Sequence, residues 1–255
     1  AASPYAERMA AVMANLSTAM SGTPGASPLL VGTGKSDTYL LVVMTADRGL
    51  CGGFNTNIVK KARERITALQ HEGKAVKLIC VGKKGNDQLK RLYGSLIVEA
   101  IDLSGEKTIS GATASAIGEK LRHMFDNDEF DVCELISSEF VSVISQKPRA
   151  KVLIPAIDAI DEGAERPDLA GAVYEAEPDE ESILNVLLPR YADTIILSAL
   201  LENVAGEMGS KMAAMDNATR NAGELIDKLN LVYNRTRQAQ ITTELTEIIS
   251  GAEAL

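Results

Sequence analysis

The chain has 255 residues, of which 45% are apolar, and a formal net charge of −9. This length and composition allow a buried core, whereas the negative charge, concentrated between Asp158 and Glu181, has the wrong sign for general binding of nucleic acid. The longest apolar runs are far shorter than the roughly 20 residues of a membrane-spanning helix, so we expect no direct membrane insertion. Three widely spaced cysteines suggest neither a disulfide framework nor a zinc site, and a reducing compartment is expected.

A short amphipathic helix is predicted near the start of the chain, over Tyr5 to Met20, and Gly22 and Pro24 end it. Strand-like and helix-like segments then alternate, which predicts an α/β domain with a Rossmann-like, mostly parallel sheet. The predicted strands are Thr38–Met44, Val76–Val81, Leu96–Ala100, Val132–Ile144 and Lys151–Ile154, with an edge strand at Tyr174–Glu177. The predicted helices are Asn55–His71, Asn86–Tyr93 and Thr108–Phe125.

Two glycine-rich segments raise the question of a phosphate-binding site. Gly32 to Ser36 (GTGKS) is like the tail of a P-loop, but Leu29 stands where that motif needs a glycine and the segment precedes its strand, so we interpret it as a flexible turn. Thr45 to Asn57 (TADRGLCGGFNTN) does follow a strand and lead into a helix, where such folds hold phosphates. It lacks the G-x-G-x-x-G spacing, and a tight turn that lets the helix pack on the sheet is the favoured interpretation.

No Ser/His/Asp or Cys/His set can be assembled from the sequence, and the carboxylates of the acidic stretch lack an apolar pocket that would shift the pKa of one of them. His71 and His123 lie in predicted helices, where a structural role is favoured over metal binding. We therefore predict no catalytic residue, no cofactor and no metal site.

The last sixty residues are the most informative part of the chain. A helix is predicted to begin near Asp179, and Pro189 is expected to kink or interrupt it. From Ala192 to Ser250 there is no proline, and a continuous helix over this range would be on the order of 90 Å long. Apolar residues follow one another here mostly in steps of three and four, which is typical of a coiled-coil seam. The seam residues are Leu201, Val204, Met208, Met215, Ala218, Ala222, Leu225, Leu229 and Val232.

Gly206, Gly209 and Gly223 flank this seam, and we expect a partner helix to approach closely there. The predicted helix at the start of the chain is at most about 25 Å long, too short to cover the seam. The partner is therefore either a helical segment that precedes Ala1 or a helix of another chain. The abrupt start of the first helix favours the former.

The end of the long helix, from Asn234 to Glu244, carries long hydrogen-bonding side chains around its whole circumference. Such a surface is suited to touching several neighbouring surfaces in turn. An apolar set follows it, which argues against a frayed, solvated end; it consists of Ile241, Leu245, Ile248 and Ile249.

This region resembles the C-terminal signature of the gamma subunit of rotary F-type ATP synthases: Ile-Thr-x-Glu, two residues, an acid, three residues and Gly-Ala. Here the signature reads Ile241, Thr242, Glu244, Glu247, Gly251 and Ala252. The segments NRTRQAQIT, LLENVAGEMGSKMAAM and VVMTADRGLCGGFNTNIVKKAR are also similar to the family, and the resemblance spans nearly the whole chain. The paired-cysteine insertion of the chloroplast type is missing from the sequence, which favours a bacterial protein.

The resemblance implies a non-catalytic central shaft that transmits torque between the membrane ring and the catalytic alpha/beta hexamer. It places the protein, as a peripheral subunit, on the cytoplasmic face of the bacterial inner membrane. It also divides the chain into a remnant of the N-terminal coiled-coil helix (1–25), an α/β domain (26–178) and a long C-terminal coiled-coil helix (179–255). The first part of the N-terminal helix of the family is missing from the sequence.

The resemblance further implies two sets of contact residues. Arg237, Gln238, Thr242 and Glu244 match positions that engage loops of the catalytic alpha and beta subunits, and Lys211 lies in a lower contact region where the family usually has arginine. Lysine keeps the charge but loses the bidentate fork. The positions that match the part facing the membrane c-ring and the epsilon subunit are Tyr174, Glu175, Glu177 and Asp179.

Two other hypotheses remain open from the residues alone. The first is a nucleotide-dependent enzyme on the α/β domain, with the turn from Gly49 to Gly53 as its phosphate site, which would bind ATP or NAD with micromolar affinity. The second is a structural adaptor whose helix joins homotypic coiled coils. The polar circumference near Arg237 argues against the adaptor.

Overall fold

A computed structural model describes Met9, Met13 and residues 27–106, 108–156 and 180–253. The chain forms two compact units, residues 1–211 and residues 212–255, which are described separately below. The predicted edge strand Tyr174–Glu177 lies outside the described residues, as does most of the predicted first helix. The three-part division of the chain into 1–25, 26–178 and 179–255 stays a prediction.

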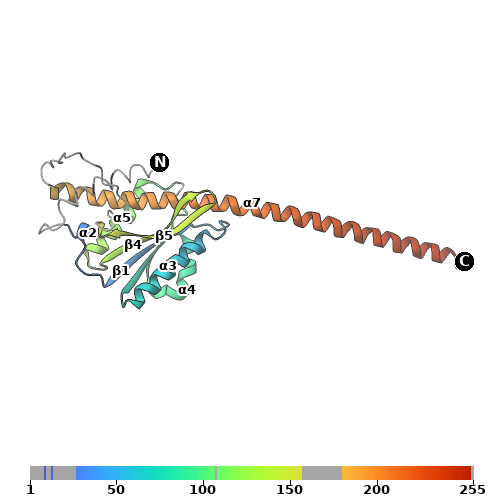
Figure 1. Cartoon of the computed structure of the whole chain (residues 1–255), viewed down its shortest axis with the longest axis horizontal. Coiled ribbons are helices and arrows are strands. Elements are labelled where there is room, and N and C mark those ends of the chain that lie inside the picture. The colour runs from blue at the N-terminus through green and yellow to red at the C-terminus, as the bar shows by residue number, and fades with distance from the viewer. Residues whose placement is uncertain (1–8, 10–12, 14–26, 107, 157–179, 254–255) are drawn as a thin grey trace. The chain divides into compact units, whose positions relative to one another are not determined.

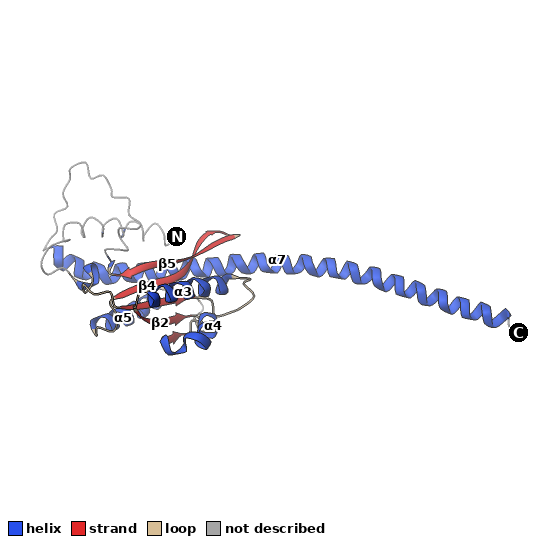
Figure 2. Ribbon diagram, turned by 60° about the horizontal axis from the view of Figure 1, so that its bottom comes forward, coloured by secondary structure: helices blue, strands red, loops and turns tan. Residues whose placement is uncertain are grey.

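The first unit is built on a five-stranded sheet in the order β3-β2-β1-β4-β5. Parallel pairing joins β1, β2, β3 and β4, and β5 runs antiparallel to β4 (Figure 2). This result confirms the predicted mostly parallel sheet. The four parallel strands have the order 3-2-1-4, as in the first four strands of a Rossmann fold. The strands are β1 (Thr38–Met44), β2 (Ala75–Val81), β3 (Ile97–Ile101), β4 (Val132–Ser142) and β5 (Ser145–Ile154).

Helices cover both faces of the sheet (Figure 1). One face packs on α3 (Phe54–His71) and α4 (Lys83–Tyr93), and the other packs on α5 (Gly111–Asp126) and on the first turns of α7 (Glu180–Glu253). The alternation of β1 produces the two cores, because Leu40 and Val42 face α5 and α7 while Leu41 and Val43 face α3. The short helices α2 (Pro28–Val31) and η1 (Gly94–Leu96), which is a 3₁₀ turn, complete the described elements.

Local chemistry explains where α5 begins. Ser110 and Thr113 form a capping box at the start of α5, each side chain bonding the backbone N–H of the other, which is why that helix begins at Gly111 and not at Thr108 as predicted. The segment Gly32 to Ser36 lies between α2 and β1, without a helix after it, as the interpretation as a turn requires.

The predicted single strand Val132–Ile144 is wrong at its end. The structure has a β-hairpin, in which β4 stops at Ser142, Val143 and Ile144 form the turn, and β5 begins at Ser145, six residues before the predicted start. Two-residue hairpin turns favour Asn-Gly or Asp-Gly, whereas Val-Ile reads as continued strand. Ile144 is 87% exposed at the tip, so the turn leaves an apolar side chain in solvent.

The sequence predicts that Pro189 kinks or interrupts the last helix, and an interruption is wrong, because α7 continues through it from Glu180 to Glu253. Burial of the flanking turns offsets the lost backbone hydrogen bond, since Leu184, Leu188 and Tyr191 are almost fully buried in the core shared with α5. Arg122 of α5 also donates from NH1 to the carbonyl oxygen of Pro189, at 3.4 Å.

One stretch of α7 is long and apolar enough, with a mean hydropathy of 1.4, to satisfy the length and composition of a membrane span. A third of that stretch is buried inside the protein. A core helix meets the same test, and the buried residues of the first turns of α7 account for the hydropathy.

A charged pair ties α3 to the sheet. Glu134 on β4 is only 3% exposed and accepts hydrogen bonds from Nε and NH2 of Arg65, at 2.8 and 2.5 Å. The guanidinium also lies 5.6 Å from the ring centre of Tyr39, and the hydrogen bonds to Glu134 raise the pKa of Arg65. The carboxylate is therefore paired where an unpaired charge would destabilise the fold strongly.

Gly82 is the glycine whose replacement we expect to be most damaging to this domain. Its φ is +94°, and a Cβ atom there would lie 2.2 Å from the carbonyl oxygen of Thr45. Gly82→Ala should lower the free energy of unfolding, measured with urea on the full chain, by at least about 2 kcal/mol more than Gly73→Ala. Gly73 is the matched control, because it has a φ of +76° but no atom within 4 Å of its added Cβ. Equal losses in the two variants would contradict the steric argument.

Candidate functional site

The carboxyl ends of β1 and β4 form the place where a ligand binds in folds of this type, since the strand order reverses between them. Here the side chain of Asn203 on α7, which is 5% exposed, bridges the two strands. Its Oδ1 accepts from the backbone N–H of Ser138 at 2.9 Å, and its Nδ2 donates to the carbonyl oxygen of Met44 at 2.9 Å. A side chain of the protein itself therefore bridges the two strands at this edge, beside a cavity of about 580 Å³ that it also lines.

The next two turns of α7 lie against the same edge of the sheet. A Cβ atom on Gly206 would lie 2.9 Å from the ring of Phe54, the first residue of α3, and one on Gly209 would lie 2.9 Å from the carbonyl oxygen of Val143 in the hairpin. Ser210 donates to Oε1 of Gln146 at 2.7 Å. We call Asn203, Gly206, Gly209 and Ser210 the α7 seat.

The prediction that Gly206, Gly209 and Gly223 admit a separate partner helix is thus wrong for the first two. They admit α3 and the β4–β5 hairpin of their own domain, whereas Gly223 has no described atom near an added Cβ. Helical spacing shows which face of a helix is small, and it does not show what packs on that face.

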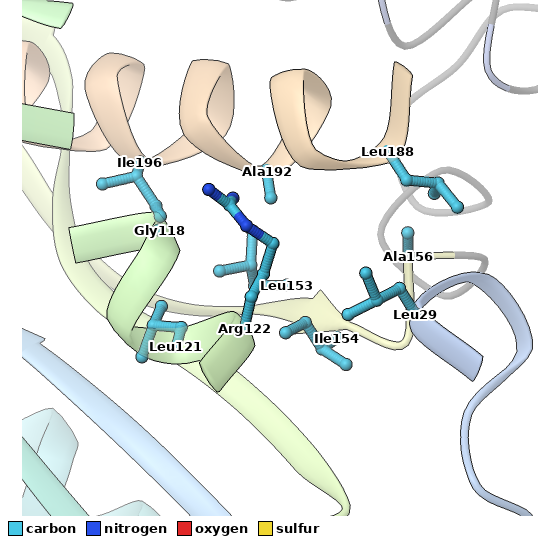
Figure 3. Close-up of a pocket in the computed structure, with 10 residues that line it drawn as sticks. All are labelled: Leu29, Gly118, Leu121, Arg122, Leu153, Ile154, Ala156, Leu188, Ala192 and Ile196. Carbon is cyan, nitrogen blue, oxygen red and sulfur yellow. The ribbon is translucent and has the colours of Figure 1, made fainter. Parts of the chain in front are cut away.

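A second attachment joins α7 to α5. Asp193 accepts hydrogen bonds from Ser115 Oγ at 2.9 Å and from Arg122 NH1 at 2.7 Å. A Cβ atom on Gly118 would lie 2.0 Å from the carboxylate of Asp193, so only glycine leaves room for this contact. Figure 3 shows Arg122 reaching from α5 toward α7 beside Gly118. The cavity next to it measures about 10 Å³, room for one water molecule and too little for a ligand.

The turn after β1, the better of the two candidates for a phosphate site, caps α4. The first three N–H groups of that helix, from Lys83, Lys84 and Gly85, donate to Asp47 Oδ1, the carbonyl of Ala46 and Thr45 Oγ1, at 3.0, 3.1 and 2.8 Å. These donors could otherwise hold a phosphate at the start of α4, which is a different helix from α3, the one that the turn leads into. The turn therefore has a structural role toward α4.

Lys211, predicted as a partner contact, lies half-buried at the end of the first unit. It lines a cavity of about 580 Å³ together with Asp47, Arg48 and Glu207. Burial raises the pKa of Glu207, Asp47 raises it further, and the positive charges of Lys211 and Arg48 act in the opposite direction. The predicted basic contact is therefore partly engaged by a carboxylate one helical turn away.

The predicted contact residues Arg237, Gln238, Thr242 and Glu244 all lie on α7 within the second unit, and all are exposed. Helical spacing places Arg237 and Glu244 along one face, with Gln238 and Thr242 on a neighbouring one. Thr242 donates to the carbonyl oxygen of Gln238 at 2.9 Å. The apolar residues among them are also exposed, from 47% for Ile241 to 68% for Ile248.

The predicted contacts to the membrane ring and the epsilon subunit, Tyr174, Glu175, Glu177 and Asp179, lie outside the described residues. Their assignment stays a prediction.

Comparison with known proteins decides the family. The model of the ATP synthase family matches residues 1–255. The ATP synthase gamma chain of Maricaulis maris is 88% identical over 255 residues, which is all of this chain and 86% of that protein, and that of Sinorhizobium medicae is 58% identical over 257 residues with the same coverage. The chain belongs to the ATP synthase gamma chain family.

Solved structures agree with this assignment. The central stalk of the Tetrahymena thermophila mitochondrial ATP synthase matches with a TM-score of 0.57 and 25% identity, over 84% of this chain and 99% of that one. A chain of the Euglena gracilis mitochondrial ATP synthase has the same fold, with a TM-score of 0.65 and 20% identity over 99% and 90% of the two chains. The suspected gamma family and its α/β fold with a long C-terminal helix are confirmed.

The α7 seat was missed by the sequence reasoning. Its one signal is that Asn203 continues the buried apolar positions Ile196 and Leu200 at helical spacing, where a polar residue needs buried partners. Those partners, Ser138 and Met44, are backbone groups distant in sequence, and no residue type marks them.

Replacing Glu207 with Gln should stabilise this gamma-family chain at neutral pH. Folding raises the pKa of Glu207 above its ordinary 4.5. The protonated Glu207 carboxyl therefore stabilises the folded protein below pH 4.5, and this stabilisation is lost as the pH rises through the pKa of the folded state. Glu207→Gln should raise the midpoint of thermal unfolding of the full chain by about 1–2 °C near neutral pH, with the gain shrinking in acid. Glu224→Gln, at an exposed position of α7, is the control and should leave the midpoint of thermal unfolding unchanged both at neutral pH and in acid. A lower midpoint for Glu207→Gln at neutral pH would mean that the attraction to Lys211 outweighs burial.

Proposed function

We propose that this chain is the central rotor shaft of a proton-translocating F-type ATP synthase. In this role it transmits torque between a membrane c-ring and a catalytic hexamer of alpha and beta subunits, without reaction chemistry of its own. The relatives at 58–88% identity are ATP synthase gamma chains, and the Tetrahymena match is described as a central stalk with its c-ring. The bacterial relatives favour a peripheral location on the cytoplasmic face of the inner membrane.

The observation that carries the proposal is the contrast between the two parts of α7. The helix is 74 residues long, and its first part is held by buried contacts at Asp193 and Asn203 within the α/β domain. In the second unit every residue with a described side chain from Met215 onward is exposed, including the seam residues Leu225, Leu229 and Val232, each at 58%. A helix with an exposed apolar seam needs a partner, and the proposed one is the N-terminal helix of an antiparallel coiled coil.

Contacts at the far end of such a shaft have to be strong enough to transmit force and polar enough to exchange. The exposed helix surface there offers both hydrogen-bond donors and hydrogen-bond acceptors, from Arg237, Gln238, Thr242 and Glu244. We propose that they contact loops of the catalytic subunits, that Lys211 makes a lower contact with the hexamer, and that Tyr174, Glu175, Glu177 and Asp179 face the c-ring and the epsilon subunit.

The nucleotide-dependent enzyme is the second hypothesis, and the turn after β1 lacks the G-x-G-x-x-G spacing of a dinucleotide site. Asn203 bridges β1 and β4, and Thr45, Ala46 and Asp47 take the N–H donors of α4, beside a cavity of about 580 Å³. Isothermal titration of the full chain with ATP and with NAD separates the hypotheses, and we expect no micromolar binding of either. A micromolar dissociation constant would favour the enzyme.

The far-end contacts are tested in the assembled complex. Arg237→Ala with Gln238→Ala removes one charged and one neutral hydrogen-bonding group, so coupled ATP turnover should fall about tenfold, on the basis of about 1.5–3 kcal/mol for a charge-assisted hydrogen bond. Lys228→Ala, also exposed on α7 but outside residues 234–244, is the control and should keep turnover near that of the wild type. Unchanged turnover and unchanged torque of the double variant in a single-molecule rotation assay would remove these residues from the proposal.

A further inference from the structure

We propose that Asn203 is a positioning residue that fixes the register of α7 on the α/β domain, so that torque passes between them without slip. The inference rests on the proposed rotor function. It concerns the part of α7 that is attached to the α/β domain, not the part that carries Arg237, Gln238, Thr242 and Glu244. It follows from the kind of contact that each part of the α7 seat makes.

The amide of Asn203 is the directional contact of the seat. The last pair in the β1–β4 register is Val43 with Ile136, and just beyond it the carbonyl of Met44 and the N–H of Ser138 both bond to Asn203. An amide donates and accepts at once, so a single side chain satisfies both strands where β1 leaves the sheet.

The other contacts of the seat support the same register but are less directional. Gly206 and Gly209 present bare backbone to Phe54 and Val143, so a slip would bring a side chain into these close approaches, but they form no hydrogen bond that fixes an orientation. Ser210 bonds to Gln146, whose own amide also donates to the carbonyls of Ser142 and Val143.

A slip of one residue would move α7 by about 1.5 Å and turn it by about 100°, which takes the amide out of reach of both partners. The buried N–H of Ser138 and C=O of Met44 would then lose their hydrogen bonds, at a cost of about 1–3 kcal/mol for each. A single buried asparagine fixes the register of coiled coils for the same reason. Asn203 therefore gives the seat one preferred register.

Two variants isolate the two hydrogen bonds. Asn203→Leu keeps the volume but loses donor and acceptor. Asn203→Asp keeps both only while the carboxyl is protonated, because a carboxylic acid donates from O–H and accepts at C=O, whereas a carboxylate only accepts. Burial raises the pKa of such an acid, so the Asp variant should regain function as the pH falls.

Other titrating groups near this position are the same in both variants. Any pH dependence that they cause therefore also occurs in Asn203→Leu, and the difference between the two variants reports the introduced carboxyl alone. Charged residues that line the adjoining cavity come from the turn after β1, from the loop after β3 and from α7: Asp47, Arg48, Glu106, Glu207 and Lys211.

The experiment measures ATP hydrolysis and ATP-driven proton pumping in membrane vesicles that contain the assembled complex. Asn203→Leu should lower the number of protons pumped per ATP hydrolysed at least twofold at every pH tested. Asn203→Asp should match it near pH 8 and recover at least half of the loss near pH 6, as protonation restores the donor (pH values approximate). Loss without pH-dependent recovery would overturn the proposal, and so would full pumping in a Leu variant whose helix setting is unchanged.

A stability control separates positioning from damage to the fold. Leu200 lies three residues before Asn203, is 3% exposed and belongs to the core, so Leu200→Ala should destabilise the domain by about 2–5 kcal/mol while leaving the amide in place. We expect it to keep the wild-type pumping ratio in complexes that assemble. An equal loss in Leu200→Ala and Asn203→Leu would assign the effect to stability and overturn the proposal.

A structural readout on the full chain does not depend on rotor function. Spin labels on Cys residues introduced at the exposed positions Lys60 of α3 and Ala205 of α7 report the setting of the helix, and the native cysteines Cys51, Cys80 and Cys133 are buried. Asn203→Leu should broaden or shift the distance distribution by at least about one residue rise, 1.5 Å. An unchanged distribution overturns the proposal, whereas a changed one with normal pumping would count against the proposed function.

Discussion

The pairing of β1 with β4 ends at Val43 and Ile136, and two backbone groups just beyond it need other hydrogen-bond partners. The attachment of α7 to the domain depends on how these two groups are paired. The N–H of Ser138 and the C=O of Met44 both bond to the buried amide of Asn203. Since buried backbone groups without partners are costly, this one side chain determines where α7 crosses the edge of the sheet. The close approaches at Gly206 and Gly209 follow from that crossing.

The same contact explains how a nucleotide-binding type of fold serves a mechanical role. The strand order of the parallel part provides a carboxyl edge at which Asn203 of α7 bonds to β1 and β4, and the turn after β1 caps α4. A domain whose ligand-binding edge is bonded to a helix of its own can anchor that helix. Asp193, bonded to Ser115 and Arg122, adds a second fixed point about ten residues earlier.

Attachment in the first unit and exposure in the second suit a subunit that works by contact with others. Burial in the first unit stabilises the helix despite Pro189, whereas the exposed seam residues Leu225, Leu229 and Val232 have no described partner in this chain. The exposed polar residues from 234 to 244 fit contacts that form and break, because exposed hydrogen bonds are individually weak. Family membership and geometry thus lead to the same proposal by separate routes.

The sequence by itself determined the family, the alternation of strands and helices, and the long last helix, because each is recorded in local periodicity or in contiguous motifs. It also placed β1, β2 and α3 to within a residue or two at each end. Tertiary structure alone decided what the small face of α7 touches, that Val143 and Ile144 turn and do not extend a strand, and that the helix survives Pro189. In each of these cases the deciding free energy comes from groups distant in sequence, such as the backbone of Met44 and Ser138 against Asn203, and spacing along the chain carries no record of them.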